Sequence, residues 1–279
     1  MDKGTQNDDK AYIKFVGEER WATFGIFNGN AFPPGLEGIV SDCSSRAAMF
    51  LYHVNALNMN MTASKRMFIR QLKSNLSEQW TQGFVNTKIN RDMNFMAIYD
   101  GLDYLAAFNC MLQELKSLLD IYANLMAKLI IPSAQLKFSK AIIEGINISG
   151  GKVVLWLRNS APTNFANTSL LSEVIVKHST DWITQAVKYR DTLIHYGDIK
   201  GLKHMHVMLK REYPPFNEAE IELPAMPDGR LLTDYCIGLV DKLANFLDES
   251  LKLLPNVDHS LIRFGSFVLP KTKTASRNI

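Results

Sequence analysis

Apolar residues recur at helical spacing along most of the chain after residue 40. One such pattern starts at Ser41 and another at Thr62, and each of these side chains can cap the first turn of a helix. The longest pattern begins near Ile89 and continues to Ile131, where Pro132 ends it because proline cannot continue a helix. These patterns predict two helices followed by a much longer one at the centre of a bundle.

The second half of the chain predicts two further helices and a β-hairpin. A helical region covers 169–196, and Gly197 stands where a residue in the left-handed conformation commonly ends a helix. Residues 204–209 have strand propensity and are expected to pair with 221–223. A last amphipathic helix covers 231–254. Its predicted buried stripe consists of Tyr235, Leu239, Leu243, Phe246, Leu247 and Leu251.

Two stretches lack a continuous helical pattern. Residues 11–40 mix aromatic residues with glycines and prolines, which favours short extended segments and turns. Residues 133–168 are less regular and predict a connector with one short helix near 153–158. We therefore expect a mainly α fold, namely a helical bundle with a small β-hairpin insertion and an irregular N-terminal segment.

Composition and charge exclude several classes of protein. The chain has 279 residues, of which 47% are apolar, so it can bury a large core without disulfides. Its 31 basic and 28 acidic residues nearly balance, which excludes a general polyanion coat and makes any contact with nucleic acid local.

The expected compartment follows from three further observations. The first ten residues are polar and acidic, and no apolar run reaches the roughly 20 residues that span a bilayer. The three cysteines, Cys43, Cys110 and Cys236, are far apart and favour free thiols in a reducing compartment. We expect a cytoplasmic protein without contact to a membrane.

Arg190 is the first candidate functional residue. Most apolar side chains of its predicted helix lie within roughly 60° of it on a helical wheel, so it falls in the middle of the buried stripe. A buried guanidinium needs an acidic partner, which is either a carboxylate inside the fold or a phosphate at an interface. Asp120 interrupts an apolar helix and is a natural carboxylate partner, and for Asp120 we favour this structural pairing over a catalytic role.

His195 follows Arg190 near the C-terminal end of the same predicted helix. A histidine exchanges protons near neutral pH, whereas an arginine keeps its charge, and the two together suit acid–base chemistry on a phosphodiester. A structural ion pair and a helix cap are the more common explanation of two such residues. From these two residues alone, the structural interpretation is therefore favoured and the functional one is the alternative.

The segment RDTLIH from Arg190 to His195 resembles the motif of the HEPN superfamily (higher eukaryotes and prokaryotes nucleotide-binding). In that motif an arginine precedes a histidine by four to six residues and is often followed directly by a polar residue, here Asp191. The order of elements is also similar: a long helix containing KSLLDIYANL, the motif helix, and a final helix after DGRLLTDY. The resemblance divides the chain into an N-terminal extension of unassigned role (1–88), a HEPN-like helical domain (89–255) and a C-terminal tail (256–279).

The resemblance implies a helical bundle that often dimerises with two motif helices face to face. Many members are metal-independent endoribonucleases in which a ribose 2′-hydroxyl attacks the neighbouring phosphate and leaves cyclic phosphate ends. In such an enzyme His195 would transfer protons, Arg190 would stabilise charge on the phosphorane, and Asp191 would orient one of them. Tyr196 and Asp120 are candidate contacts to the substrate, although packing explains Tyr196 as well.

The resemblance also implies partners and an alternative. No metal or other cofactor is expected. The expected partners are RNA or a nucleotide, a second copy of the chain, and an antitoxin or another protein of a bacterial defence system. Because some members have lost activity, the alternative is a catalytically silent module that binds nucleotides or partner proteins.

Overall fold

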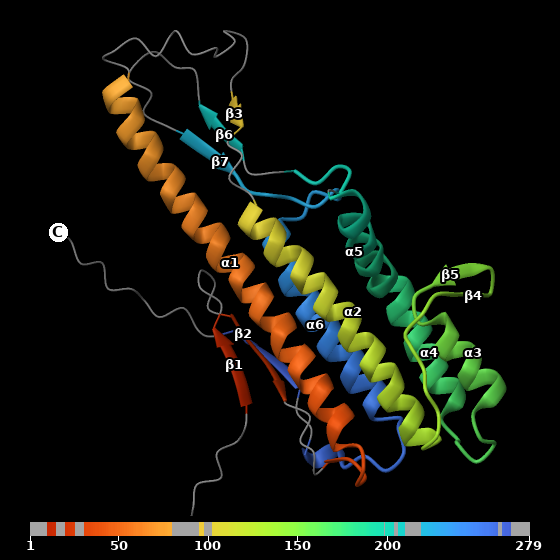
Figure 1. Ribbon diagram of the computed structural model, residues 1–279. Coiled ribbons are helices and arrows are strands. Elements are labelled where there is room, and N and C mark those ends of the chain that lie inside the picture. The colour runs from red at the N-terminus through yellow and green to blue at the C-terminus, as the bar shows by residue number, and fades with distance from the viewer. Residues whose placement is uncertain are drawn as a thin grey trace, which may run out of the picture.

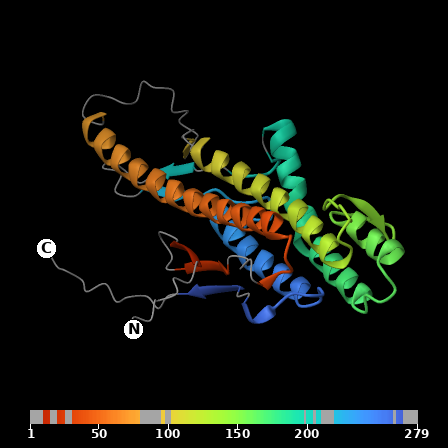
Figure 2. The same ribbon diagram turned by 60° about the horizontal axis from the view of Figure 1, so that its bottom comes forward.

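The computed structural model in Figure 1 shows a mainly helical protein, as the sequence predicts. It describes residues 10–14, 20–25, 31–79, 95–97, 102–197, 199–203, 206–209, 219–261 and 264–268. Within these ranges, long helices build the body of the molecule, and short strands lie around it (Figures 1 and 2).

Two long helices, α1 (Glu37–Gln79) and α2 (Leu102–Ile130), lie side by side along much of their length (Figures 1 and 2). The sequence predicted separate helices from residues 41 and 62, but α1 is continuous. The reason is local: no proline and no glycine interrupts the chain between Gly38 and its end, and Thr62 is tolerated inside a helix. The end of α2 before Pro132 is confirmed.

The third helix of the body is α6 (Leu232–Leu251), whose predicted stripe is buried throughout. One continuous cluster of buried apolar side chains joins it to the first two helices. Phe50 of α1, Phe108 of α2 and Leu243 of α6 are all fully buried in this cluster. Residues on both sides of the predicted boundary at residue 88 therefore contribute to one core. None of the described helices is both long and apolar enough to cross a membrane.

A second layer of helices covers one side of this body. The helix α3 (Gly151–Ser160) is followed by a nearly continuous rod of α4 (Thr168–His178), a π-helical segment η3 (Ser179–Ile183) and α5 (Thr184–Tyr196). This rod packs against α2 and α6. It matches the helical region predicted over 169–196, except that the π-helical segment was not foreseen.

The predicted end of that rod at Gly197 is confirmed. Gly197 adopts the left-handed conformation with φ 73°, and its N–H donates to the carbonyl oxygen of Leu193 at 3.0 Å. Only a residue without a Cβ takes this conformation at little cost, which is why glycine is common at this position.

The predicted β-hairpin is confirmed by β6 (His206–Leu209) and β7 (Ala219–Glu222), which pair antiparallel with Val207 opposite Ile221. A third strand, β3 (Phe95–Ala97), pairs with β6. The prediction of one helix from residue 89 is therefore wrong over 95–97, because strand pairing with β6 outweighs the helical pattern there.

The stretch predicted as a connector holds a second hairpin that the sequence analysis missed. Its strands are β4 (Ala141–Ile143) and β5 (Ile146–Ile148). The turn between them places Glu144 and Gly145 in the left-handed region, with φ values of 51° and 83°. The short helix expected near 153–158 is present as α3.

A three-stranded sheet combines the two ends of the chain. The strands β1 (Lys10–Lys14) and β2 (Arg20–Gly25) confirm the extended segments predicted near the N-terminus. Their partner β8 (Phe264–Val268) pairs antiparallel with β2 and lies within the range predicted as a tail. No local pattern in the sequence predicts this pairing, because its partners are more than 200 residues apart.

Candidate functional site

Arg190 and His195 both lie in the last two turns of α5. Five residues of an α-helix correspond to a rotation of about 140°, so the two side chains leave the helix on different faces. The side chain of Arg190 is 33% exposed, whereas His195 is exposed at the helix end. The buried stripe predicted around Arg190 is present only in part, since Val187 and Leu193 are buried but Ile194 is 43% exposed.

Arg190 takes its carboxylate partner from the next residue in the chain. Its Nη1 donates to Oδ1 of Asp191 at 2.9 Å, and Oδ2 of the same carboxylate accepts from Nζ of Lys140 at 3.0 Å. Partial burial alone would raise the pKa of Asp191, but the two cations outweigh it and hold that pKa below its ordinary value. The Nε of Arg190 is buried and has no hydrogen-bond partner among the described residues.

Asp120 does not meet Arg190. Its Oδ2 accepts from Nζ of Lys116 at 2.5 Å, and its Oδ1 accepts from the backbone N–H of Phe138 at 2.9 Å. Lys116 lies one turn earlier on the same face of α2, which makes it the nearest cation to this carboxylate. Asp120 is thus structurally paired, as favoured from the sequence, but with partners other than Arg190.

The end of α5 presents a small surface that is partly apolar. Tyr196 is 81% exposed, and its ring meets the ring of His195 edge-on with centroids 6.3 Å apart. Ile194 is exposed beside them. In Figure 2 this end of α5 stands clear of the neighbouring helices. One copy of the chain therefore offers His195 to a partner or substrate, while Arg190 faces elsewhere.

A series of side-chain hydrogen bonds near the middle of the rod was not predicted from the sequence. Trp182 donates its indole N–H to Nδ1 of His178 at 3.0 Å, and Nε2 of His178 meets Oε2 of Glu249 at 3.1 Å. Because an indole N–H can only donate, Nδ1 accepts and Nε2 carries the proton. These hydrogen bonds connect α4 and η3 to α6. Their only sequence signal is a histidine and a tryptophan one helical turn apart.

Glu249 also accepts from Nζ of Lys177 at 2.9 Å. This hydrogen bond is the main reason that the pKa of Glu249 is lowered; partial burial opposes it, and the contact with His178 adds to it. Lys177 is largely exposed, whereas His178 is only 6% exposed. Of the two side chains that contact Glu249, His178 is therefore the buried one.

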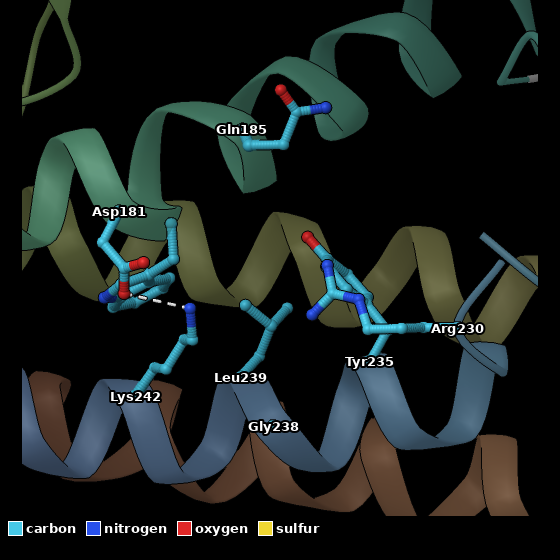
Figure 3. Close-up of a pocket in the computed structure, with 8 residues that line it drawn as sticks. Asp181, Gln185, Arg230, Tyr235, Gly238, Leu239 and Lys242 are labelled. Carbon is cyan, nitrogen blue, oxygen red and sulfur yellow. Dashed lines mark hydrogen bonds and ion pairs between the residues drawn. The ribbon is translucent and has the colours of Figure 1, made fainter. Parts of the chain in front are cut away.

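A small groove, with a cavity volume of about 50 Å³, lies between the rod and α6 (Figure 3). Asp181, Trp182 and Gln185 line it from η3 and α5, and Gly238 and Leu239 line it from α6. From the sequence, Leu239 was predicted only as a core residue, and the other four were not candidate functional residues.

The two ends of the groove are polar. At one end Nζ of Lys242 lies 3.0 Å from Oδ2 of Asp181 (Figure 3). At the other end the guanidinium carbon of Arg230 lies 5.3 Å from the centre of the Tyr235 ring. Among the described residues, no three His, Cys, Asp or Glu side chains are grouped in a way that could hold a metal ion.

Comparison with known proteins adds no relative. No protein-family model matches the chain, and no curated protein or solved structure is similar to it at a significant level. The resemblance to the HEPN superfamily therefore rests on the motif in α5 and on the order of the helices around it.

Proposed function

We propose that this protein is a metal-independent endoribonuclease of the HEPN type. The observation that carries the proposal is the end of α5, where an exposed His195 and a partly exposed Arg190 lie within two turns of a helix that stands clear of the body. A titratable imidazole and a permanent cation are the two groups that cleavage of a phosphodiester needs when no metal takes part.

The reaction is a transesterification. The ribose 2′-oxygen forms a bond to phosphorus, the bond from phosphorus to the 5′-oxygen breaks, and the products are a cyclic phosphate and a 5′-hydroxyl. The proton of the 2′-hydroxyl passes to an imidazole, and an imidazolium returns a proton to the departing 5′-oxygen. Arg190 stabilises the additional negative charge on the phosphorane, and such stabilisation is commonly worth about 3 kcal/mol.

The angular separation of the two side chains favours a site built from two copies. Because Arg190 and His195 diverge by about 140° around α5, one chain does not direct both at the same phosphate. A second motif helix placed against the first would supply the missing group. The exposed Ile194 and Tyr196 give this end of α5 apolar surface for such a contact.

Asp191 and Lys140 serve as positioning residues in this proposal. The carboxylate of Asp191 lies between the two cations and fixes one edge of the Arg190 guanidinium. The other edge remains for a phosphate oxygen, since a guanidinium has five N–H donors. Tyr196, at the exposed end of the helix, is the candidate contact to ribose or phosphate.

One observation favours a catalytically silent binding module as the second candidate. Arg190 already has an acidic partner in Asp191, which Lys140 shares, and this arrangement satisfies part of the guanidinium without any substrate. A module of this kind would bind RNA or a nucleotide without cleaving it. Cleavage of single-stranded RNA in the presence of a chelator, compared between the wild type and His195→Ala, distinguishes the two candidates.

The cellular setting follows from the resemblance and not from the site. A ribonuclease of this type acts on cytoplasmic RNA, and the three cysteines are all free, as expected in a reducing compartment. A role in bacterial defence, with an antitoxin as a protein partner, belongs to the same proposal.

A further inference from the structure

The outer face of α1 carries large apolar side chains that the core does not cover. Residues 47–64 of this helix contain no Asp, Glu, Lys or Arg. Leu57 points into the core and is fully buried, whereas Met49, Tyr52 and Met59 are 43%, 57% and 47% exposed. A helix that is apolar on more than one side is usually covered on each of them, and clustered exposed apolar side chains mark interaction sites. The outer face of α1 therefore requires a partner.

The exposed apolar residues repeat at the spacing of a coiled coil. From Ser45, alternate steps of four and three residues lead to Met49, Tyr52, Ala56 and Met59. These five residues form the outer seam of α1. A repeat of this kind keeps side chains on one line along a helix, so a second helix can pack against the whole line. The spacing therefore indicates that the partner is itself a helix.

Each end of the outer seam continues into a charged residue. Three residues before Ser45 the repeat reaches Asp42, which is exposed, and after Met59 it reaches Ala63 and then Arg66. Asp42 and Arg66 are about 36 Å apart along the helix, so one copy of α1 does not pair them with each other. A matching helix must present a cation to Asp42 and an anion to Arg66.

These charges select a second copy of α1 that runs in the opposite direction. Asp42 and Arg66 each lie twelve residues from Val54. Two antiparallel copies of α1 that are aligned at the level of Val54 therefore bring Asp42 of each copy opposite Arg66 of the other. Two parallel copies would place Asp42 opposite Asp42 and Arg66 opposite Arg66, and these like charges repel.

The apolar residues match in the same antiparallel alignment. Met49 and Met59 each lie five residues from Val54, so they face each other across the pair. Tyr52 and Ala56 each lie two residues from it, so a large ring faces a small methyl group. Large residues opposite small ones allow two helices to interdigitate closely. One alignment thus satisfies both the charges and the volumes.

We propose that α1 forms an antiparallel pair with α1 of a second copy of this chain. The outer seam lies at the centre of the contact, and an ion pair between Asp42 and Arg66 closes each end. The same surface is used by both copies, as a two-fold axis requires.

This contact is separate from the one proposed at the end of α5. Figures 1 and 2 show α2 between α1 and α5, so pairing through α1 leaves the end of α5 free. A copy that makes both contacts has two different neighbours, and the closed assembly then contains four copies. The pairing through α1 does not depend on ribonuclease activity, because Arg190 and His195 take no part in it.

The test is the molar mass of the full chain, measured by light scattering over a range of protein concentrations. Tyr52→Glu places a charge in the middle of the outer seam and should halve the mass of the wild type. Leu170→Glu is the matched control, because Leu170 is 51% exposed on α4 and lies outside the seam, and it should leave the mass unchanged. Both side chains are more than half exposed, so both variants should fold, which circular dichroism checks.

Reversal of the end charges tests the direction of the pair. Asp42→Arg and Arg66→Asp should each weaken association by about tenfold, because each places like charges at both ends of the contact. The variant that combines the two substitutions should associate within about threefold of the wild type, because opposite charges face each other again. Parallel pairing predicts no weakening by either single substitution.

Four results overturn the proposal: a wild type that stays monomeric, a mass that Tyr52→Glu does not change, single charge variants that associate as well as the wild type, and a combined variant no better than the single ones. Cleavage of RNA is not measured in any of these experiments. Failure of the ribonuclease proposal therefore leaves their outcome unaffected.

Discussion

Trp182 donates its indole N–H to Nδ1 of His178 at 3.0 Å, at the point where the rod of α4 and α5 widens into a π-helix. His178 in turn meets Glu249 of α6. Both rings are buried, so the Trp182–His178 hydrogen bond is shielded from water, and the Glu249 carboxylate that completes the connection between the two helical layers is partly exposed. π-Helical segments often occur near functional sites, and this one forms a wall of the groove.

Trp182→Phe should lower the free energy of unfolding by about 1 to 3 kcal/mol, because it leaves the buried Nδ1 of His178 without a donor. Unfolding in urea measures the change. Lys177→Ala is the matched control, since Lys177 contacts the same Glu249 from an exposed position and should cost under about 1 kcal/mol. Equal stability of Trp182→Phe and the wild type would show that the hydrogen bond does not contribute.

Asp191→Asn should lower stability at neutral pH and lose that effect in acid. The folded protein lowers the pKa of Asp191 from its ordinary value of 3.8, so the carboxylate contributes stability above that value and loses its contribution as the pH falls through the lowered pKa. The loss at pH 7 should be under about 1 kcal/mol, because the pair is partly exposed and screened by solvent.

Urea unfolding of the wild type and Asp191→Asn at pH 7 and near pH 3 tests this dependence. Lys140→Met should reproduce part of the loss at pH 7, because it removes one of the two cations on the same carboxylate. A difference between wild type and Asp191→Asn that stays constant across this range would exclude the proposed contribution of the charge pairs.

Gly150 and Gly197 should respond differently to alanine, although both have positive φ. A Cβ on Gly150 would come within 2.4 Å of Cζ of the buried Phe138, whereas one on Gly197 would meet nothing within 4 Å. Gly197→Ala adds only backbone strain of about 1 kcal/mol, and Gly150→Ala adds a steric clash in the core that raises the cost above about 2 kcal/mol. Thermal unfolding measures both, and equal shifts would contradict the packing at Phe138.

The sequence predicted those parts of the fold that local patterns control. The buried stripe of α6 follows from helical periodicity, and the end of α5 follows from the conformational freedom of Gly197. The pairing of β6 with β7 follows from strand propensity on both sides of a loop, whereas its register was not predicted. Strands β3 and β8 were missed because each is stabilised by a partner far away in the sequence, which no local pattern reveals.

The candidate site was predictable only in part. The motif located Arg190 and His195 on one helix, but it did not reveal that Arg190 pairs with the adjacent Asp191 while Asp120 pairs with Lys116. The groove was not predictable, because the contact between Arg230 and Tyr235 at one of its ends depends on the fold of the loop before α6. A tyrosine in an apolar stripe gives no sign of an unpaired hydroxyl.

If the site is built from two copies, a mixture of two inactive variants should be active. Arg190→Ala and His195→Ala should each be inactive, but a mixture refolded together should recover part of the activity, because mixed dimers again contain one arginine and one histidine at the shared site. Light scattering should find Tyr52→Glu, which lacks the contact through α1, as a dimer. A monomer, or a mixture as inactive as its components, would contradict the two-copy site.

The central claim is tested most directly by cleavage of a mixed panel of single-stranded RNAs in excess chelator. The wild type is compared with His195→Ala and with His259→Ala, an exposed histidine in the short helix at 259–261, after circular dichroism confirms that all three are folded. We predict that wild type and His259→Ala give cyclic phosphate and 5′-hydroxyl ends, and that His195→Ala is slower by at least about 100-fold. No cleavage by a folded wild type, or equal cleavage by His195→Ala, would contradict the ribonuclease proposal.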